Sequence, residues 1–275
     1  MKKAVTIARA PGDSPNMTSN DTGLLQDIAT ELKAMGATVV EQGENESIPA
    51  DAGVICSMSR TETTLQSISE AELRGISAIN TPAAVRNCSR KQFMELLQKS
   101  SIPQPEYKLL HSQDDLMPHC YPCWIKQAEG WSRHKDDVCH ASTKAEAEKA
   151  IEQMRARGHR EFIQMQHCEG DIVKFYAVGE RFFHWYYPNA GSSKFGLEVH
   201  NGTQQHHPFN AARLQEIAHK AAKATGVTVY GGDCIVTKEG DIYIIDINDF
   251  PSFSPVRSEA AKEIAKLIID KLYER

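Results

Sequence analysis

The sequence near its C-terminal end reads Asp241-Ile242-Tyr243-Ile244-Ile245-Asp246-Ile247-Asn248. Side chains alternate between the two faces of a β-strand, so every second residue of this stretch is expected to share a face. That face carries Ile242, Ile244, Asp246 and Asn248. The pattern predicts a strand whose apolar row ends in two oxygen-bearing groups.

A short turn at Lys238-Glu239-Gly240 precedes this strand and predicts a hairpin with the segment 227–236. The partner segment carries Asp233, which can lie across from Asp246 and Asn248. Burying carboxylates without a counter-charge costs several kcal/mol, whereas Mg²⁺ takes one or two carboxylates together with phosphate oxygens. We therefore expect a metal site at these three residues. Polar residues that end a strand and face water are the alternative.

The bulk composition excludes several classes of function. The chain has 275 residues and a formal net charge of −5, so it has no broad cationic field that would favour nucleic acid as a partner. Its apolar stretches fall short of the roughly 20 residues that span a bilayer, and Arg9 interrupts the only apolar run near the start. No membrane association and a cytoplasmic location are expected. The seven cysteines do not resemble a disulfide framework, and Cys120-Tyr121-Pro122-Cys123 is interpreted as structural.

The first part of the chain alternates predicted strands with predicted helices, an order that is typical of an α/β unit with a parallel sheet. The strands are expected at 3–8, 36–40, 53–56 and 76–79, and the helices at 21–35 and 61–74. The dipeptide Thr81-Pro82 is expected to end this unit, because proline pushes the residue before it towards an extended conformation.

The rest of the chain predicts two further units. Ser89 and Gln92 have capping-box spacing and predict a helix that ends near Gln98. Further strands are expected at 107–110, 124–127, 138–140, 162–166, 171–178 and 181–187, and further helices at 143–156, 211–225 and 258–272. We expect domain boundaries that give the units 1–85, 86–167 and 168–275.

Lysines interrupt two apolar strands and point to an anionic ligand. Lys126 and Lys174 are each flanked by hydrophobic residues; lysine is seldom buried unpaired, and phosphate oxygens are suitable partners. Salt bridges or solvent-facing positions are the alternatives. Lys91, in the first turn of its helix, opposes the helix dipole unless an anion compensates it. Ser132, in the polar loop 128–137, belongs to a segment that can cover phosphate groups.

Neither of the two commonest nucleotide-binding loop motifs occurs in the chain. The combination of separated lysines and a C-terminal acid cluster instead resembles the ATP-grasp superfamily, of the carboxylate–amine ligase type that includes ribosomal-protein-modifying and glutathione synthase-like ligases. The resemblance runs from about Asn80 to the C-terminus. It is carried by Asn80-Thr81-Pro82, Ser89-Arg90-Lys91, Ile102-Pro103-Gln104-Pro105, Phe162 to His167, Glu169 to Gly179, Gly232-Asp233, Ile245 to Asn248 and Pro251-Ser252-Phe253.

The resemblance implies an ATP-grasp fold of mixed α/β and α+β class, with an N-terminal Rossmann-like pre-grasp domain and Mg-ATP, or Mn-ATP, held between two grasp subdomains. It places Lys91, Lys126 and Lys174 on ATP phosphates. The backbone of a hinge would meet adenine, and this hinge comprises Gln164, Met165, Gln166 and His167, with Met165 in place of the usual Glu. Glu169 or Asp171 would lie near the ribose. Metal roles fall on Asp233, Asp246 and Asn248, where Asp246 replaces the more common Glu.

The activity implied by the resemblance is an ATP-dependent ligation of a small-molecule or peptide carboxylate to an amine, through an acyl phosphate. Lys174 and Arg257 are the candidate catalytic residues, and Arg60 is a further candidate for gripping an anionic substrate. An inositol phosphate kinase-like phosphotransferase and a non-catalytic ATP-binding protein are the alternatives. The identity of the substrate and a homo-oligomeric state stay open.

Overall fold

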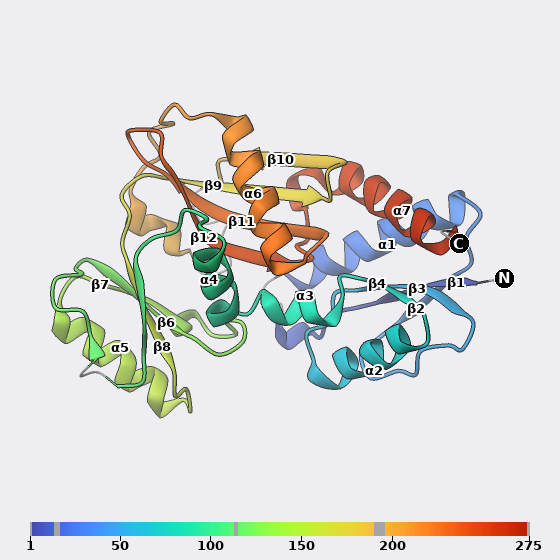
Figure 1. Cartoon of the computed structure of the whole chain (residues 1–275), viewed down its shortest axis with the longest axis horizontal. Helices are drawn as coiled ribbons and strands as arrows, with labels where there is room; N and C mark the ends of the chain where they lie inside the picture. Colours follow the sequence, from blue (N-terminus) through green and yellow to red (C-terminus); the bar gives the residue numbers. More distant parts are fainter. Residues whose placement is uncertain (1, 14–16, 113–114, 190–195, 274–275) are drawn as a thin grey trace.

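The computed structural model describes residues 2–13, 17–112, 115–189 and 196–273. Within them the chain forms three four-stranded sheets, each built from a separate part of the sequence. Figure 1 shows the first sheet at the N-terminal end of the long axis, with the second and third sheets facing each other at the opposite end. Residues 190–195, in the loop before the helix expected at 211–225, lie outside the described residues.

The first sheet is parallel, as strand and helix alternation predicted. Its order is β2 (Val39–Gln42), β1 (Lys3–Ile7), β3 (Ala52–Ser57) and β4 (Ser77–Ile79). The helices α1 (Thr18–Ala34) and α2 (Glu62–Leu73) accompany it. β3 is buried along its whole length, in keeping with a parallel strand that is covered on both faces.

The last helix, α7 (Arg257–Tyr273), packs against α1 and the first sheet, and it also contacts β9 of the third sheet. Ile264 and Ile268 of α7 share a hydrophobic core with Leu24 and Ile28 of α1. In Figure 1 the two helices lie side by side, although they stand at opposite ends of the sequence. The domain boundaries after residues 85 and 167 therefore stay a prediction, and the chain returns to its first layer at its end.

The second sheet has the order β5 (Tyr107–Leu110), β8 (Phe162–Gln166), β6 (Cys123–Gln127) and β7 (Val138–Ala141), with antiparallel pairing throughout. Helix α5 (Lys144–Ala156) covers one face through Ala147, Ile151 and Met154, which recur at helical spacing. β8 is an interior strand, so its backbone is hydrogen-bonded on both sides.

The third sheet has the order β10 (Phe182–Tyr186), β9 (Asp171–Val178), β11 (Val229–Val236) and β12 (Ile242–Asp249), again antiparallel. Helix α6 (Ala211–Thr225) packs against one face of it with Leu214, Ile217 and Ala221 in the shared core. Short 3₁₀ turns complete the chain at η1 (Pro11–Asp13), η3 (Lys135–Asp137), η4 (Leu197–Asn201) and η5 (Ser254–Val256).

Two short helices connect the first sheet to the others, and both differ from the sequence prediction. Thr81-Pro82 is expected from the sequence to end the first unit, but it begins a helix, α3 (Pro82–Asn87). The Thr81 side chain caps this helix, and proline stands in its first turn. α4 (Arg90–Lys99) begins where predicted, but the Ser89 hydroxyl donates to the Gln92 side chain instead of capping the backbone. The first backbone N–H groups of α4 donate to carbonyls of residues 130 and 128. The loop therefore supplies the cap that the predicted capping box does not.

The predicted alternation along β12 is wrong at one point. Asp233 pairs with Asp246 whereas Cys234 pairs with Ile244, so Ile245 has no partner and the strand carries a β-bulge. The extra residue reverses the alternation, because two residues then oppose one. Ile242, Ile244 and Ile247 point into the core, and Ile245, Asp246 and Asn248 face the opposite side.

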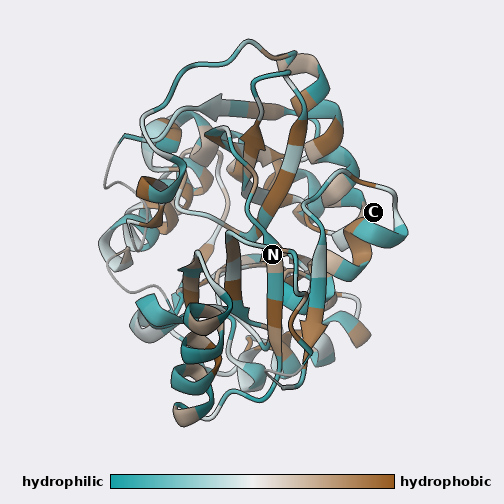
Figure 2. Cartoon of the chain, turned by 90° about the vertical axis from the view of Figure 1, so that its left-hand side faces the viewer, coloured by the Kyte–Doolittle hydropathy of each residue, from teal (hydrophilic) through white to brown (hydrophobic). Residues whose placement is uncertain are grey.

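Hydrophobic residues concentrate on the strands and on the inner sides of the helices, and hydrophilic residues on their outer sides (Figure 2). No helix in the described ranges combines the length and the apolar character needed to cross a membrane.

Candidate active site

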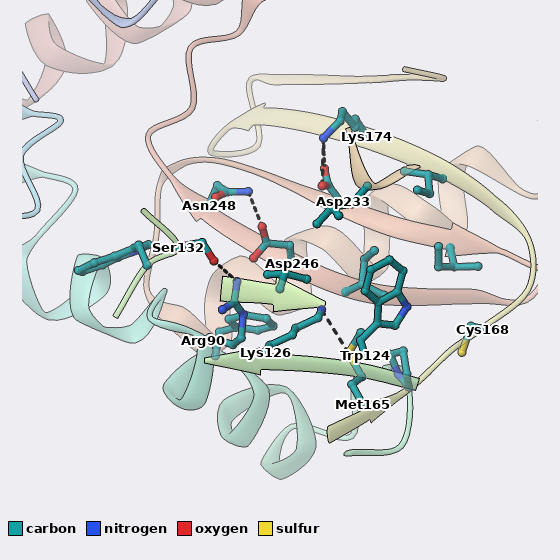
Figure 3. A pocket seen from close by; sticks show the side chains of 18 of the residues that line it. Arg90, Trp124, Lys126, Ser132, Met165, Cys168, Lys174, Asp233, Asp246 and Asn248 are labelled. Atoms are coloured by element: carbon teal, nitrogen blue, oxygen red, sulfur yellow. Dashed lines mark hydrogen bonds and ion pairs between the residues drawn. The ribbon is translucent and has the colours of Figure 1, made fainter. Parts of the chain in front are cut away.

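A cavity of about 290 Å³ lies between the second and third sheets and is shown in Figure 3. This size is near the lower end of the range for small-molecule sites. Strands β6 and β8 line one side, strands β9, β11 and β12 line the other, and the start of α4 with the loop 130–132 lines one end. Side chains of opposite charge converge on it from four strands, from the start of α4 and from the loop after β3.

The acidic side of the cavity is built by the bulged hairpin. Asp233 and Asp246 are direct cross-strand partners, and the Asn248 Nδ2 donates to Asp246 Oδ2 at 3.1 Å. Lys174 Nζ lies 2.8 Å and 3.0 Å from the two carboxylate oxygens of Asp233. Burial by itself would lower the pKa of Lys174, but Asp233 outweighs it and raises that pKa above its ordinary value. Lys174 therefore stays charged.

The oxygen donors of this side fit a magnesium ion. Among the described residues no group of three or more His, Cys, Asp and Glu side chains is placed to hold a metal by itself. Two carboxylates and one amide do face the cavity together at Asp233, Asp246 and Asn248. Mg²⁺ commonly uses one or two protein carboxylates and takes its other oxygens from phosphates and water. Three protein oxygen donors are consistent with this coordination preference, and they are too few for a closed metal site made of protein ligands alone.

Two cations on the other side of the cavity have no carboxylate partner among the described residues. The Arg90 guanidinium donates to the Gln127 carbonyl at 2.8 Å and to Ser132 Oγ at 2.9 Å. Lys126 is 8% exposed, and in the described part of the chain its Nζ donates to the sulfur of Met165, at 3.6 Å. Burial, and secondarily the charge of Arg90, lower the pKa of Lys126 to about 7. A buried pair of like charges is costly unless an anion joins it.

Lys91 does not join this group. Its Nζ donates to both carboxylate oxygens of Glu161, at 2.9 Å and 2.8 Å, on the outer side of α4, and Lys91 does not line the cavity. Consecutive helical residues point about 100° apart, so Arg90 and Lys91 leave the helix in different directions. The structure places Arg90 at the cavity, a residue that the sequence analysis did not single out.

The residues of the predicted hinge separate into two groups. Met165 and Gln166 line the cavity. The Gln164 side chain is buried and bonds to the backbone of Met117 and Cys120, outside the cavity. Backbone N–H groups of Gln166 and His167 already donate to carbonyls of Glu106 and Pro122. The hinge is therefore tied to its neighbours, and only its end at Met165 and Gln166 reaches the cavity.

Neither candidate for a ribose contact lines this cavity. Asp171 is 3% exposed, and its two carboxylate oxygens accept the backbone N–H groups of Gln205 at 2.7 Å and His207 at 2.6 Å. It therefore anchors the loop that precedes α6. Glu169 is exposed at the turn between β8 and β9.

Trp124 lines the apolar end of the cavity, beside Met165 and Cys168. Its indole Nε1 donates to His167 Nδ1 at 3.1 Å, and His140 and His200 pack around it with ring centroids 5.1 Å and 5.3 Å from the indole. A large flat ring held in this way offers a stacking surface for a nucleobase. Three histidines that looked unrelated in the sequence therefore meet at one position.

The two arginines expected to grip a substrate have different surroundings. Arg60 lines the cavity, stacks on Trp131 at 5.0 Å and pairs with the buried carboxylate of Asp249 at 2.6 Å. Arg257 does not line the cavity, because its Nε donates to Asp27 of α1 at 2.8 Å. Of the two, only Arg60 can reach a ligand in this arrangement.

Comparisons with known proteins show which proteins this chain is similar to. A probable alpha-L-glutamate ligase of Azotobacter vinelandii is 24% identical over 209 residues, which cover 73% of this chain and 68% of that protein. The crystal structure of a RimK domain ATP-grasp protein from Sphaerobacter thermophilus superposes with a TM-score of 0.72 at 15% identity, over 96% of this chain and 98% of that one. D-alanyl-alanine synthetase A from Vibrio cholerae superposes with a TM-score of 0.70 at 16% identity, over 99% and 98%.

At such identities the two structures show a shared fold and no more. The decisive comparison is with the sequence pattern of the RimK-like ATP-grasp domain, which matches residues 88–272, more than half of the chain. The match covers both sheets that enclose the cavity, together with α4 and its Arg90. The chain is thus a member of the RimK-like ATP-grasp domain family.

Proposed function

We propose that this chain is an ATP-dependent ligase that joins a carboxylate to an amine, with Mg-ATP in the cavity between the second and third sheets. Membership of the RimK-like ATP-grasp family and ligase-named relatives support this class of reaction, and they favour neither the phosphotransferase nor the non-catalytic alternative. The relative of Azotobacter vinelandii makes glutamate the first substrate to test. A cytoplasmic location is part of the proposal, because the reaction consumes ATP.

The observation that carries the proposal is the pair formed by Arg90 and Lys126. Both cations face the cavity, neither has a carboxylate within ion-pair distance among the described residues, and the charge of Arg90 adds to burial in lowering the pKa of Lys126. A polyphosphate supplies the negative charge that would stabilise both. In this proposal the base of a nucleoside triphosphate lies against the indole of Trp124 at one end of the cavity, and its phosphates lie near the acidic hairpin at the other end.

Asp233, Asp246 and Asn248 would hold the metal, which supplies charge neutralisation and orientation of the β- and γ-phosphates when it is bound. Lys174 binds Asp233 in the ligand-free chain and is our candidate to bind the phosphoryl group during its transfer. Ser132 and the 128–137 loop lie over the same end of the cavity, next to Arg90. Positioning and charge neutralisation by these residues account for most of what phosphoryl transfer needs from a protein.

The proposed ligation has two steps. A carboxylate oxygen of the substrate attacks the γ-phosphorus, ADP leaves, and an acyl phosphate forms. The amine of the second substrate then attacks the acyl carbon, loses a proton, and releases inorganic phosphate as the amide forms. Arg60 is the residue of the first sheet placed to contact the carboxylate substrate, since it lines the cavity and is held by Asp249.

The test is a screen of carboxylates and amines, glutamate first, that scores phosphate release with Mg-ATP and adds hydroxylamine in parallel. An acyl phosphate is trapped by hydroxylamine as a hydroxamate, so the proposal expects both phosphate release and hydroxamate with the same carboxylate. The Asp246→Asn variant serves as the inactive control. ATP consumption that phosphorylates a hydroxyl acceptor, with no hydroxamate, would replace the ligase with the phosphotransferase.

A further inference from the structure

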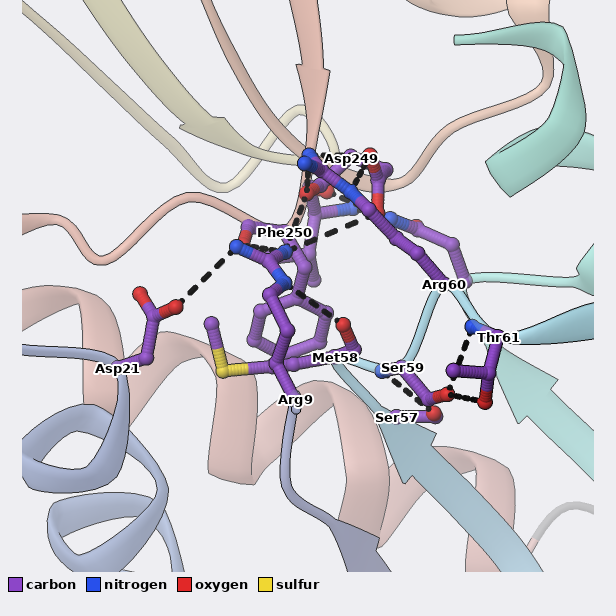
Figure 4. A network of polar contacts seen from close by, with 11 residues as sticks. Arg9, Asp21, Ser57, Met58, Ser59, Arg60, Thr61, Asp249 and Phe250 are labelled. Carbon is purple, nitrogen blue, oxygen red and sulfur yellow. Dashed lines mark hydrogen bonds and ion pairs between the residues drawn. The ribbon is translucent and has the colours of Figure 1, made fainter. Parts of the chain in front are cut away.

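Arg9 follows β1 in the first sheet, yet its guanidinium reaches three other parts of the chain (Figure 4). Its Nε donates to the Met58 carbonyl at 2.8 Å, and Nη1 donates to Asp21 of α1 at 3.2 Å. Its Nη2 donates to the carbonyls of Asp249 at 3.1 Å and Phe250 at 3.0 Å. The Arg9 side chain is 5% exposed. One buried cation therefore ties the first sheet to the end of β12.

The end of β12 is the part of the fold that presents the metal donors. After the bulge, Asp246 and Asn248 face the cavity, while Asp249 points to the opposite side and is 1% exposed. The Asp249 carboxylate accepts Arg60 Nε at 2.9 Å and lies 3.8 Å from Arg9 Nη2. Two arginines, Arg9 after β1 and Arg60 after β3, therefore bind the residue that follows Asn248.

The backbone at this point is also unusual. Phe250 has a φ of +48°, a left-handed conformation that is strained for a bulky residue, and it is fully buried. Strained residues persist only where their surroundings hold them, and they gather at functional sites. The Phe250 carbonyl is one of the two that Arg9 binds. Arg9 therefore fixes the conformation of the segment that leaves the metal-binding strand.

We propose that Arg9 is a positioning residue for the metal end of the active site. It does not touch the nucleotide or the metal; it sets where Asp246 and Asn248 stand by holding the carbonyls of the next two residues. This inference rests on the proposed function, because it assigns a role to Arg9 in binding Mg-ATP. In this proposal the N-terminal part of the chain helps to position the metal ligands, although no residue there is a candidate metal ligand.

The competing explanation is that Arg9 only stabilises the packing between the first sheet and the rest of the chain, which we call adhesion. The two explanations predict different effects on the unfolding temperature and on the Mg²⁺ requirement. Adhesion predicts a lower unfolding temperature with an unaltered metal requirement. Positioning predicts a higher Mg²⁺ concentration for half-maximal ATP binding, at a temperature where the variant is fully folded. ATP binding in the presence of EDTA separates the two explanations further. Without metal, the proposed phosphate contacts are Lys126 and Arg90, and their hydrogen-bond partners do not include Arg9. Positioning therefore predicts that metal-free affinity is nearly unchanged.

The main variant is Arg9→Met combined with Asp21→Asn, which removes the buried carboxylate together with the cation and so leaves no orphaned charge. Calorimetric titration at fixed ATP should show at least a tenfold higher Mg²⁺ requirement, and ATP affinity in EDTA should change by less than about threefold. Arg181→Met is the matched control, since Arg181 pairs with Asp270 and also ties the third sheet to α7, without touching β12. It should leave both quantities unchanged.

Arg9→Lys provides a second measurement if the double variant does not fold. Lysine keeps the charge next to Asp21 but cannot reach the three carbonyls of Met58, Asp249 and Phe250 together. A threefold to tenfold rise in the Mg²⁺ requirement supports the proposal, and an unchanged requirement in a folded Arg9→Lys protein overturns it. If the wild-type chain itself does not bind Mg-ATP, the proposed function fails first, and the two failures are therefore distinguishable.

Discussion

Asp233 and Asp246 stand directly opposite each other on the paired strands β11 and β12, so two carboxylates share one face of the sheet at the edge of the cavity. Like charges in direct cross-strand positions are unfavourable. Lys174 compensates Asp233, and Asn248 donates one hydrogen bond to Asp246. Among the described residues Asp246 has no cation within ion-pair distance, which is the charge imbalance that the proposed metal would compensate.

Replacing Asp246 with Asn should abolish Mg²⁺-dependent ATP binding while leaving the fold intact. The variant loses repulsion from Asp233 but also loses attraction to Arg90 and Lys126, so the unfolding temperature should move by less than about 3 °C. Thermal unfolding with and without Mg-ATP measures both effects. Asp241→Asn, in the turn of the same hairpin, is the control and should keep the ATP-induced stabilisation. An Asp246→Asn protein that still shows that stabilisation would refute the metal assignment.

The affinity for ATP should fall as the pH rises through about 7. Burial lowers the pKa of Lys126 from its ordinary value of 10.5 to about 7 in the ligand-free chain, and bound phosphate would raise it again. ATP binding should therefore take up protons near neutral pH, and titration in buffers of different ionisation enthalpy measures that uptake. The stability of the ligand-free chain depends on pH in the opposite direction to the affinity for ATP. This group makes the fold more stable as the pH rises from about 7 towards 10.5, because the unfolded chain binds the proton more tightly.

Substitutions at Met165, which contacts Lys126, test whether Lys126 is the group that takes up the proton when ATP binds. Met165→Glu places a carboxylate next to the Lys126 ammonium and should move the fall in ATP affinity to higher pH. Met165→Leu removes the sulfur contact without adding a charge, so it should leave the midpoint near 7. An affinity that is independent of pH between 6 and 9 would contradict the prediction.

Arg90 should contribute more to ATP binding than its neighbour Lys91. A hydrogen bond between charged groups contributes roughly 1.5–3 kcal/mol, so Arg90→Met should weaken ATP binding by about tenfold to a hundredfold. Lys91→Met should change the affinity by less than about twofold, since Lys91 is paired with Glu161 outside the cavity. Equilibrium binding of ATP to both variants, at a temperature where each is folded, decides between them. A larger loss in Lys91→Met would restore the role that the family resemblance implied.

Asp171 should matter for stability rather than for nucleotide affinity. Its two oxygens accept the backbone N–H groups of Gln205 and His207, and an Asn side chain can accept only one of them. Loss of one such buried hydrogen bond costs about 1–3 kcal/mol, which corresponds to a decrease of roughly 2–10 °C in the unfolding temperature of Asp171→Asn. ATP affinity below that temperature should stay within about twofold. Glu169→Gln, at the adjacent exposed turn, should leave both quantities unchanged. A selective loss of ATP affinity in Asp171→Asn would return this residue to the ribose site.

Local sequence patterns determined most of the secondary structure. The predicted limits of β5, β8 and α6 coincide with the observed ones, and the parallel order of the first sheet followed from alternating strand and helix patterns. These features depend on residues close together in the chain, where periodicity and turn residues act. The turn also brings Asp233 close to Asp246, but only the bulge sets the two carboxylates directly opposite each other, because the register at Cys234 and Ile244 would otherwise pair Asp233 with Ile245.

Tertiary structure alone decided which face each side chain occupies and which distant residues meet. The bulge at Ile245 turns Asp246 and Asn248 towards the cavity, and only pairing with β11 creates that bulge. Arg90 faces inwards instead of Lys91 because the loop at 128–130 binds the start of α4. The contact between Arg9 and Phe250 joins residues 241 positions apart. Such contacts depend on the packing of complete sheets, and no local pattern in the sequence encodes them.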